Sequence, residues 1–192
     1  MAIASHESSG VQIFVVTALA AAPPPVRYPL TIGVSGNGTV VADTGTVGWN
    51  GPVGTCECDA GTQVRLTARA TAGSIFSGWS GCDVTASGAC DVTMSAARTV
   101  GASFAACGYR ITPPGPESYK KNGGSGTVVV AALAGCSWTA VSNADWITIT
   151  SGAAGSGAGT VLYSVARNQE SKKVRTGTIS VAGLSFTVNQ AK

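Results

Sequence analysis

Short segments in which apolar and polar residues alternate recur about every ten residues along most of the chain. In Gln63–Ala68, for example, Val64, Leu66 and Ala68 alternate with polar neighbours. This period of two is that of a half-buried β-strand, and no sustained 3.6-residue period indicates a helix. Glycine, at 26 of 192 residues, supplies the conformations that tight turns need. The pattern therefore predicts an all-β fold of short strands, with the spacing typical of sandwiches and barrels.

The length and the proline-rich segments divide the chain into three parts. A chain of 192 residues has room for two small domains. Pro23–Pro25 begins a stiff, polyproline-like linker. We therefore predict an N-terminal arm and linker over residues 1–27, a first β module over 28–106 and a second over 107–192.

The N-terminal arm contains a mostly apolar run, Val11–Ala22, which is too short to span a bilayer. Three interpretations remain open. The run is the remnant of a signal peptide, or an arm that docks on a partner, or the last strand of an upstream repeat. The third rests on the similarity of Val16–Ala21 to Val100–Ala105, where the first module ends.

Three turn signals fix expected connections between strands. Asn37–Gly38 predicts a type I′ hairpin turn. The small residues of Gly152–Ala158 predict a loop, and Ala182–Gly183 predicts a hairpin between Arg175–Val181 and Leu184–Gln190.

The six cysteines predict disulfide bonds and therefore an oxidising compartment, because an even number in small glycine-rich modules is typical of a disulfide framework. Zinc is the competing interpretation, but the chain has no Cys-x-x-Cys pair and a single histidine, His6. We expect no metal site. The cysteines are Cys56, Cys58, Cys82, Cys90, Cys107 and Cys136.

The ionisable residues do not form a recognisable catalytic set, so we expect no catalytic residues, no cofactor and no enzymatic activity. A hydrolase needs a nucleophile with a base, or two carboxylates across a substrate. Most acids are single residues in expected turns, and Glu57 with Asp59 is interpreted as a solvated pair rather than a cation site. The net charge of +3 is thinly spread, so nucleic-acid binding is not expected.

The aromatic residues separate into core and candidate contact positions. Trp79, Trp138 and Trp146 alternate with apolar neighbours and are expected in the core. Trp49 lies in a Gly/Pro-rich loop outside that pattern, is expected to be exposed and is the first candidate for ligand contact, with Tyr119 second. Exposed aromatic rings are the groups on which sugars stack.

Residues 28–105 resemble the divergent InlB-type B-repeat of bacterial surface proteins. The resemblance implies a compact β module of the kind strung together in secreted or surface-anchored proteins. It is carried by Leu30–Ile32, Gly36–Val40, Gly61–Ala68, Gly73–Cys82, Cys90–Met94 and Val100–Phe104.

Residues 107–190 resemble the BACON-type domain. The resemblance implies an immunoglobulin-like sandwich and a carbohydrate-binding role. It is carried by Cys107–Tyr109, Gly135–Ala140, Trp146–Ile149, Gly157–Val161, Arg175–Ile179 and Phe186–Gln190.

With these resemblances the cysteines can be assigned to pairs. Cys82 and Cys90 flank a short loop that a bond would close, and Cys107 and Cys136 recur together in the BACON pattern. Cys56 and Cys58 are open: they form a small ring, pair elsewhere or stay reduced, and we favour the ring.

Together these features predict a non-catalytic, extracellular binding or adhesion module of a bacterial surface or secreted protein, with a glycan or another surface protein as partner. Self-assembly through edge strands or the N-terminal arm is a further expectation. The alternative is a structural β-sandwich component of a virion or extracellular filament.

Overall fold

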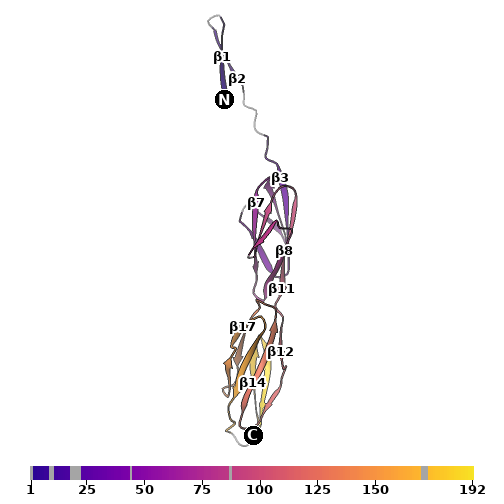
Figure 1. The fold of residues 1–192 in the computed structure, drawn as a ribbon, viewed down its shortest axis with the longest axis vertical. Helices are drawn as coiled ribbons and strands as arrows, with labels where there is room; N and C mark the ends of the chain where they lie inside the picture. Colours follow the sequence, from indigo (N-terminus) through magenta and orange to yellow (C-terminus); the bar gives the residue numbers. More distant parts are fainter. Residues whose placement is uncertain (1, 9–10, 18–22, 44, 87, 170–172) are drawn as a thin grey trace.

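The computed structural model describes residues 2–8, 11–17, 23–43, 45–86, 88–169 and 173–192. The described part of the chain is β-structure without helices, which confirms the predicted fold class. Figure 1 shows an N-terminal hairpin followed by two β modules that lie end to end. We call β3–β11 module 1 and β12–β20 module 2. The strands are β1 (Ala2–Ser8), β2 (Val11–Thr17), β3 (Arg27–Ser35), β4 (Gly38–Ala42), β5 (Gly48–Asn50), β6 (Val53–Asp59), β7 (Gln63–Ala70), β8 (Ser74–Ser80), β9 (Val84–Ala86), β10 (Ala89–Thr93), β11 (Arg98–Ala106), β12 (Tyr109–Thr112), β13 (Glu117–Tyr119), β14 (Gly124–Ala132), β15 (Ser137–Ser142), β16 (Ile147–Ser151), β17 (Ala154–Ser156), β18 (Gly159–Val165), β19 (Arg175–Val181) and β20 (Leu184–Gln190).

The N-terminal hairpin pairs β1 with β2 in antiparallel register, from Ala2 opposite Thr17 to Ser8 opposite Val11. Residues 18–22 lie outside the described residues. The hypothesis that Val16–Ala21 is the last strand of an upstream repeat therefore concerns residues that lie largely outside the described part of the chain.

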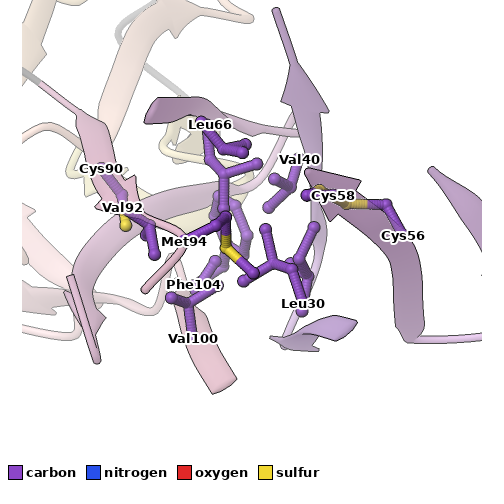
Figure 2. Packing of buried hydrophobic residues seen from close by; sticks show 13 residues of the cluster. Leu30, Val40, Cys56, Cys58, Leu66, Cys90, Val92, Met94, Val100 and Phe104 are labelled. Atoms are coloured by element: carbon purple, nitrogen blue, oxygen red, sulfur yellow. A yellow bond between two sulfur atoms is a disulfide. The ribbon is translucent and has the colours of Figure 1, made fainter. Parts of the chain in front are cut away.

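Module 1 packs a four-stranded sheet, in the order β4-β7-β10-β9, against a five-stranded sheet, β5-β6-β3-β11-β8. In β7 the burial alternates as the sequence predicts, with Val64 and Leu66 almost completely buried. Met94, just after β10, is fully buried between the sheets (Figure 2). The buried core residues are Leu30, Ile32, Val40, Cys56, Cys58, Val64, Leu66, Cys90, Val92, Met94, Val100, Ala102 and Phe104.

The hairpin predicted at Asn37–Gly38 is wrong, because β3 and β4 belong to different sheets. A type I′ turn needs positive φ at both central residues, whereas here the positive φ is at Gly36, at 84°. Phe104 of β11 explains the geometry. A Cβ at Gly36 would collide with the Phe104 carbonyl, and a Cβ at Gly38 would collide with its ring. The two glycines therefore let the chain pass closely over Phe104 as it crosses between sheets.

Module 2 packs the sheet β12-β14-β18-β16 against the sheet β13-β20-β19-β15-β17. Its core includes the fully buried Phe186 and the almost fully buried Tyr163, whose rings meet edge to face at 5.7 Å. The predicted loop Gly152–Ala158 contains a strand, β17, which pairs with β15. The prediction of a loop is therefore wrong for these residues. Trp138 of β15 pairs with Gly155 of β17, and the two strands can pair because Gly155 has no side chain to collide with the Trp138 ring. The hairpin at Ala182–Gly183 is confirmed, with φ values of 51° and 78° and full pairing of β19 with β20.

Candidate binding site

A groove opens in module 1 between β4 and β5, which are edge strands of the two facing sheets. Its volume is about 380 Å³. Trp49, the first candidate contact residue, is 44% exposed as predicted, but the predicted loop is wrong at this point, because Trp49 lies on the short strand β5, which pairs with β6. The described residues that line the groove are Val34, Gly36, Gly38, Thr39, Val40, Trp49, Gly51 and Pro52.

The position of the Trp49 ring is set by the neighbouring strand β6. Trp49 is paired with Gly54 in the antiparallel register, and a Cβ at Gly54 would lie 3.0 Å from Cη2 and Cζ3 of the indole. The same Cβ would lie 2.8 Å from Cγ1 of Val47. Because Gly54 has no side chain, the indole rests directly on the backbone of β6. This support limits the ring's freedom while nearly half of the residue stays open to solvent.

The groove presents an aromatic surface, aliphatic side chains and one hydroxyl group, that of Thr39. Among its described lining residues none carries an ionisable side chain. Such a surface suits stacking against the apolar face of a neutral ligand, with a hydroxyl and nearby backbone groups for hydrogen bonds. Sequence reasoning identified Trp49 but not Thr39 or Pro52, because the groove forms only when the two sheets face each other.

Tyr119, the second candidate contact residue, is partly buried in module 2. Its hydroxyl donates a hydrogen bond to the Tyr163 hydroxyl at 2.9 Å, and its ring lies close to Gly124 and Gly126. Burial raises the pKa of the Tyr163 phenol well above its usual range. The structure thus gives Tyr119 packing contacts rather than an open surface.

The three tryptophans expected in the core differ in burial. Trp138 is 5% exposed and its Nε1 donates to the Gly157 carbonyl at 2.8 Å. Trp79 is only partly buried against the core of module 1, and its Nε1 donates to the Gly88 carbonyl at 3.0 Å. Trp146 is also partly buried, with the guanidinium of Arg175 4.3 Å from its ring centroid.

All six cysteines form disulfide bonds in the structure: Cys56–Cys58, Cys82–Cys90 and Cys107–Cys136. The first is the small ring within β6. Cys56 and Cys58 are two residues apart on a strand, so both side chains point into the core, where each is 7% exposed. Figure 2 shows this bond at the margin of the module 1 core.

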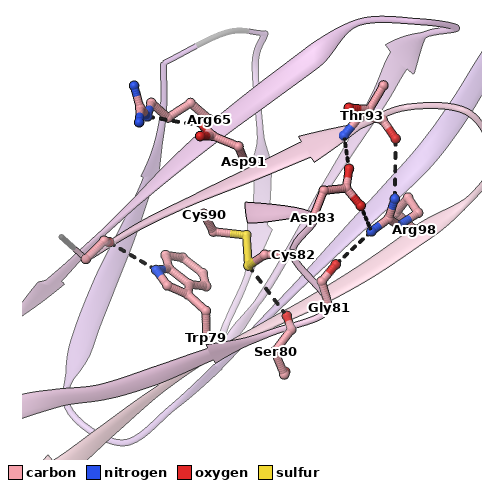
Figure 3. Close-up of a disulfide and its surroundings, with 11 residues drawn as sticks. Arg65, Trp79, Ser80, Gly81, Cys82, Asp83, Cys90, Asp91, Thr93 and Arg98 are labelled. Atoms are coloured by element: carbon pink, nitrogen blue, oxygen red, sulfur yellow. Dashed lines mark hydrogen bonds and ion pairs between the residues drawn. A yellow bond between two sulfur atoms is a disulfide. The ribbon is translucent and has the colours of Figure 1, made fainter. Parts of the chain in front are cut away.

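The Cys82–Cys90 bond lies beside a small charged network (Figure 3). One Asp83 oxygen accepts from Arg98 Nη2 at 2.7 Å, and the other accepts from the Thr93 backbone N–H at 2.6 Å. These hydrogen bonds, that of Arg98 first, lower the pKa of the Asp83 carboxyl below its ordinary value of 3.8. Arg98 also donates to the Gly81 carbonyl at 2.9 Å. The network holds the segment around β9 against β10 and β11.

Glu57 and Asp59 are exposed at the end of β6. Asp59 forms an ion pair with Arg27 Nε at 2.8 Å, with both side chains more than half exposed. No group of three or more His, Cys, Asp or Glu residues suited to a metal ion occurs among the residues that the structure describes. Within the same residues, no helix has the length and hydropathy to cross a membrane.

Comparison with known proteins agrees with both predicted resemblances. Residues 28–108 match the model of the divergent InlB B-repeat domain, and residues 137–191 match the BACON model, described as "Putative binding domain, N-terminal". No curated protein matches the chain. One solved structure with a similar part is that of a Bacteroides ovatus GH5 xyloglucanase in complex with a XXXG heptasaccharide, at 19% identity and a TM-score of 0.39. The match covers 44% of this chain and 19% of the xyloglucanase chain.

Both domain types, together with the disulfides, point to a secreted or surface protein with a binding role. The order of the two matches is the order predicted from the sequence. In chain order, residues 28–108 therefore match the divergent InlB B-repeat domain and residues 137–191 match the BACON domain.

Proposed function

We propose that this chain is a non-catalytic binding module of a secreted or surface protein, and that it binds a neutral glycan in the groove beside Trp49. The observation that carries the proposal is the exposed indole itself, which is 44% exposed and rests on Gly54 at the margin of a groove of about 380 Å³. A pyranose ring has an apolar face that stacks on an aromatic ring. A ring already held in place loses little conformational entropy when the ligand binds.

The chemistry of the groove supports a neutral sugar over a charged ligand. Its described lining residues bring no charge to pair with a carboxylate or sulfate group. The Thr39 hydroxyl can both donate and accept a hydrogen bond, as a sugar hydroxyl requires. An open groove between two edge strands also leaves room for the neighbouring residues of a longer chain.

A glycan microarray with the whole chain tests the proposal. We expect binding to neutral oligosaccharides and loss of that binding in Trp49→Ala. Trp49→Phe should retain part of the affinity, because it keeps a ring for stacking. Val84→Ala is the matched control, since Val84 is 56% exposed on β9, an edge strand that does not line the groove. Absence of binding to every neutral glycan, or full binding by Trp49→Ala with an unchanged unfolding midpoint, would refute the proposal.

A further inference from the structure

We propose that the chain is built to carry tension between the segment before β3 and the segment after β20. This inference does not depend on glycan binding. It rests on how β3 and β11 of module 1 and β13 and β20 of module 2 are paired, and on what holds the two modules together. A force along the chain loads these strand pairs parallel to their axes, so that many backbone hydrogen bonds must break together.

In module 1 the first strand, β3, is paired directly with the last strand, β11, and the two run parallel. Their register extends over six residue pairs, from Leu30 opposite Arg98 to Ser35 opposite Ser103. Tension pulls β3 toward its N-terminal end and β11 toward its C-terminal end. Because the strands are parallel, these directions are opposite, and the strands can separate only by sliding. Figure 1 shows the chain entering module 1 at one end and leaving at the other.

Both strands are also held on their outer sides. β3 pairs with β6 over seven residue pairs, and β11 pairs with β8. Neither disulfide of module 1 joins β3 or β11 to another strand. The resistance of module 1 to tension therefore comes from hydrogen bonds loaded in shear.

Module 2 has a corresponding arrangement at its C-terminal end. β20 is paired in parallel with β13 and antiparallel with β19, the latter over seven residue pairs. The parallel pairing is extended by the Ala191 N–H, which donates to the Tyr119 carbonyl at 2.9 Å. A force on the C-terminal end must slide β20 out between two strands at once.

The last residue of β20, Gln190, is anchored by its side chain. It is polar yet only 1% exposed. Its Nε2 lies within hydrogen-bond distance of the carbonyls of Lys120, Lys121 and Ala166, at 3.2, 3.0 and 3.0 Å. Its Oε1 accepts from Arg175 Nε at 2.8 Å. A buried amide with all these contacts joins the end of β20 to three other segments at the point where the load leaves the module.

At the junction between the modules, the Cys107–Cys136 disulfide bond carries the load past the residues between these two cysteines. The Cys107 N–H donates to the Gly73 carbonyl of module 1 at 2.8 Å, and its sulfur is bonded to Cys136 in module 2. The bond spans a sequence separation of 29 residues. While it is intact, those residues cannot be extended.

Single-molecule force spectroscopy on the whole chain tests the proposal through the choice of attachment points. Handles at Val26 and Lys192 load β3 and β11 in shear. Handles at Val26 and Ala97, just before β11, pull the same two strands apart from one end, so that the six pairs break one after another. All three residues are exposed. We expect module 1 to open at a force several times lower in the second geometry, because forced unfolding follows the rate of the loaded unfolding step. Equal forces in the two geometries would overturn the proposal.

The disulfide and Gln190 provide checks on module 2. Reduction of the Cys107–Cys136 bond should increase the extension gained when module 2 unfolds by about 100 Å, since 29 residues are released at about 3.5 Å each. This increase identifies the unfolding of module 2 in the force trace. Gln190→Met should lower the opening force of module 2 and leave that of module 1 unchanged. Ser185→Ala, at an exposed position earlier in β20, is the control. An unchanged force in Gln190→Met would refute the anchoring role of Gln190.

Discussion

Removal of the Cys107–Cys136 bond should destabilise module 2 by about 3.5 kcal/mol, because in the chain-entropy model this is the cost for a loop of the observed sequence separation of 29. The change to test is Cys107→Ala with Cys136→Ala, which leaves no unpaired thiol. Cys136 is fully buried, so the missing sulfur adds a packing loss to the entropic one. A loss of this size is a large fraction of the total stability of a small domain.

The matched control is the pair Cys82→Ala and Cys90→Ala in module 1. Its sequence separation is 8, so the same model gives a smaller loss of about 2.5 kcal/mol. Hydrogen exchange in increasing urea, read by mass spectrometry, reports both modules in one sample. Peptides around Ile179 report module 2, and peptides around Ile32 report module 1, because both residues are fully buried in their cores.

The two variants should therefore affect different modules. In the Cys107/Cys136 variant we expect the module 2 peptides to exchange at a lower urea concentration than in the unchanged chain. In the Cys82/Cys90 variant we expect the same of the module 1 peptides, with a smaller decrease in urea concentration. If both modules lose stability equally in each variant, or module 2 is unaffected by loss of its bond, then the bond does not act by restricting the unfolded chain of module 2.

Two further predictions concern packing and charge. Gly155→Ala should destabilise module 2 by about 1–3 kcal/mol, because its Cβ would lie 2.7 Å from Trp138 Cε2. Urea unfolding measures this loss. The control is Gly108→Ala, which should leave the stability almost unchanged because a Cβ there meets nothing within 4 Å. The pKa of the Asp83 carboxyl is lowered in the folded chain by Arg98 and a backbone N–H. The ionised carboxylate therefore adds to the free energy of unfolding of module 1 above pH 3.8, and this stabilisation is lost as the pH falls through the pKa of the folded chain. Asp83→Asn should remove that part of the acid dependence, and an unchanged pH profile of urea unfolding would contradict this assignment.

The strands that the sequence predicted are those whose buried positions carry aliphatic or aromatic side chains. β6 has no apolar alternation in the sequence, because its inward positions are Gly54, Cys56 and Cys58, and the cysteines become apolar core residues only when they are joined. β17 was missed because it consists of small residues whose role is to leave space for Trp138. In both strands the pairing depends on a partner that local sequence does not reveal.

The candidate site shows a similar division. Trp49 could be identified because it falls outside the alternating pattern, in a segment rich in glycine and proline. The opposite wall of the groove, including Thr39 and Val40, belongs to the other sheet. The sequence could not place it there, because the Asn37–Gly38 signal predicted a hairpin within one sheet. Which sheet a strand joins is decided by long-range packing, here by Phe104 beneath the crossing.

The contacts of Cys107 also determine where the two modules can be separated. A fragment that ends at residue 106 lacks the N–H that binds the Gly73 carbonyl, and a fragment that begins at residue 108 leaves Cys136 with a free thiol. Neither cut gives two intact modules, because Cys107 contributes its N–H to a hydrogen bond with module 1 and its sulfur to the disulfide bond of module 2. Recombination that exchanged module 1 for a homologue would therefore be tolerated best if Cys107 stayed with module 2 and the incoming module kept the backbone conformation that points the carbonyl at the position of Gly73 toward the Cys107 N–H.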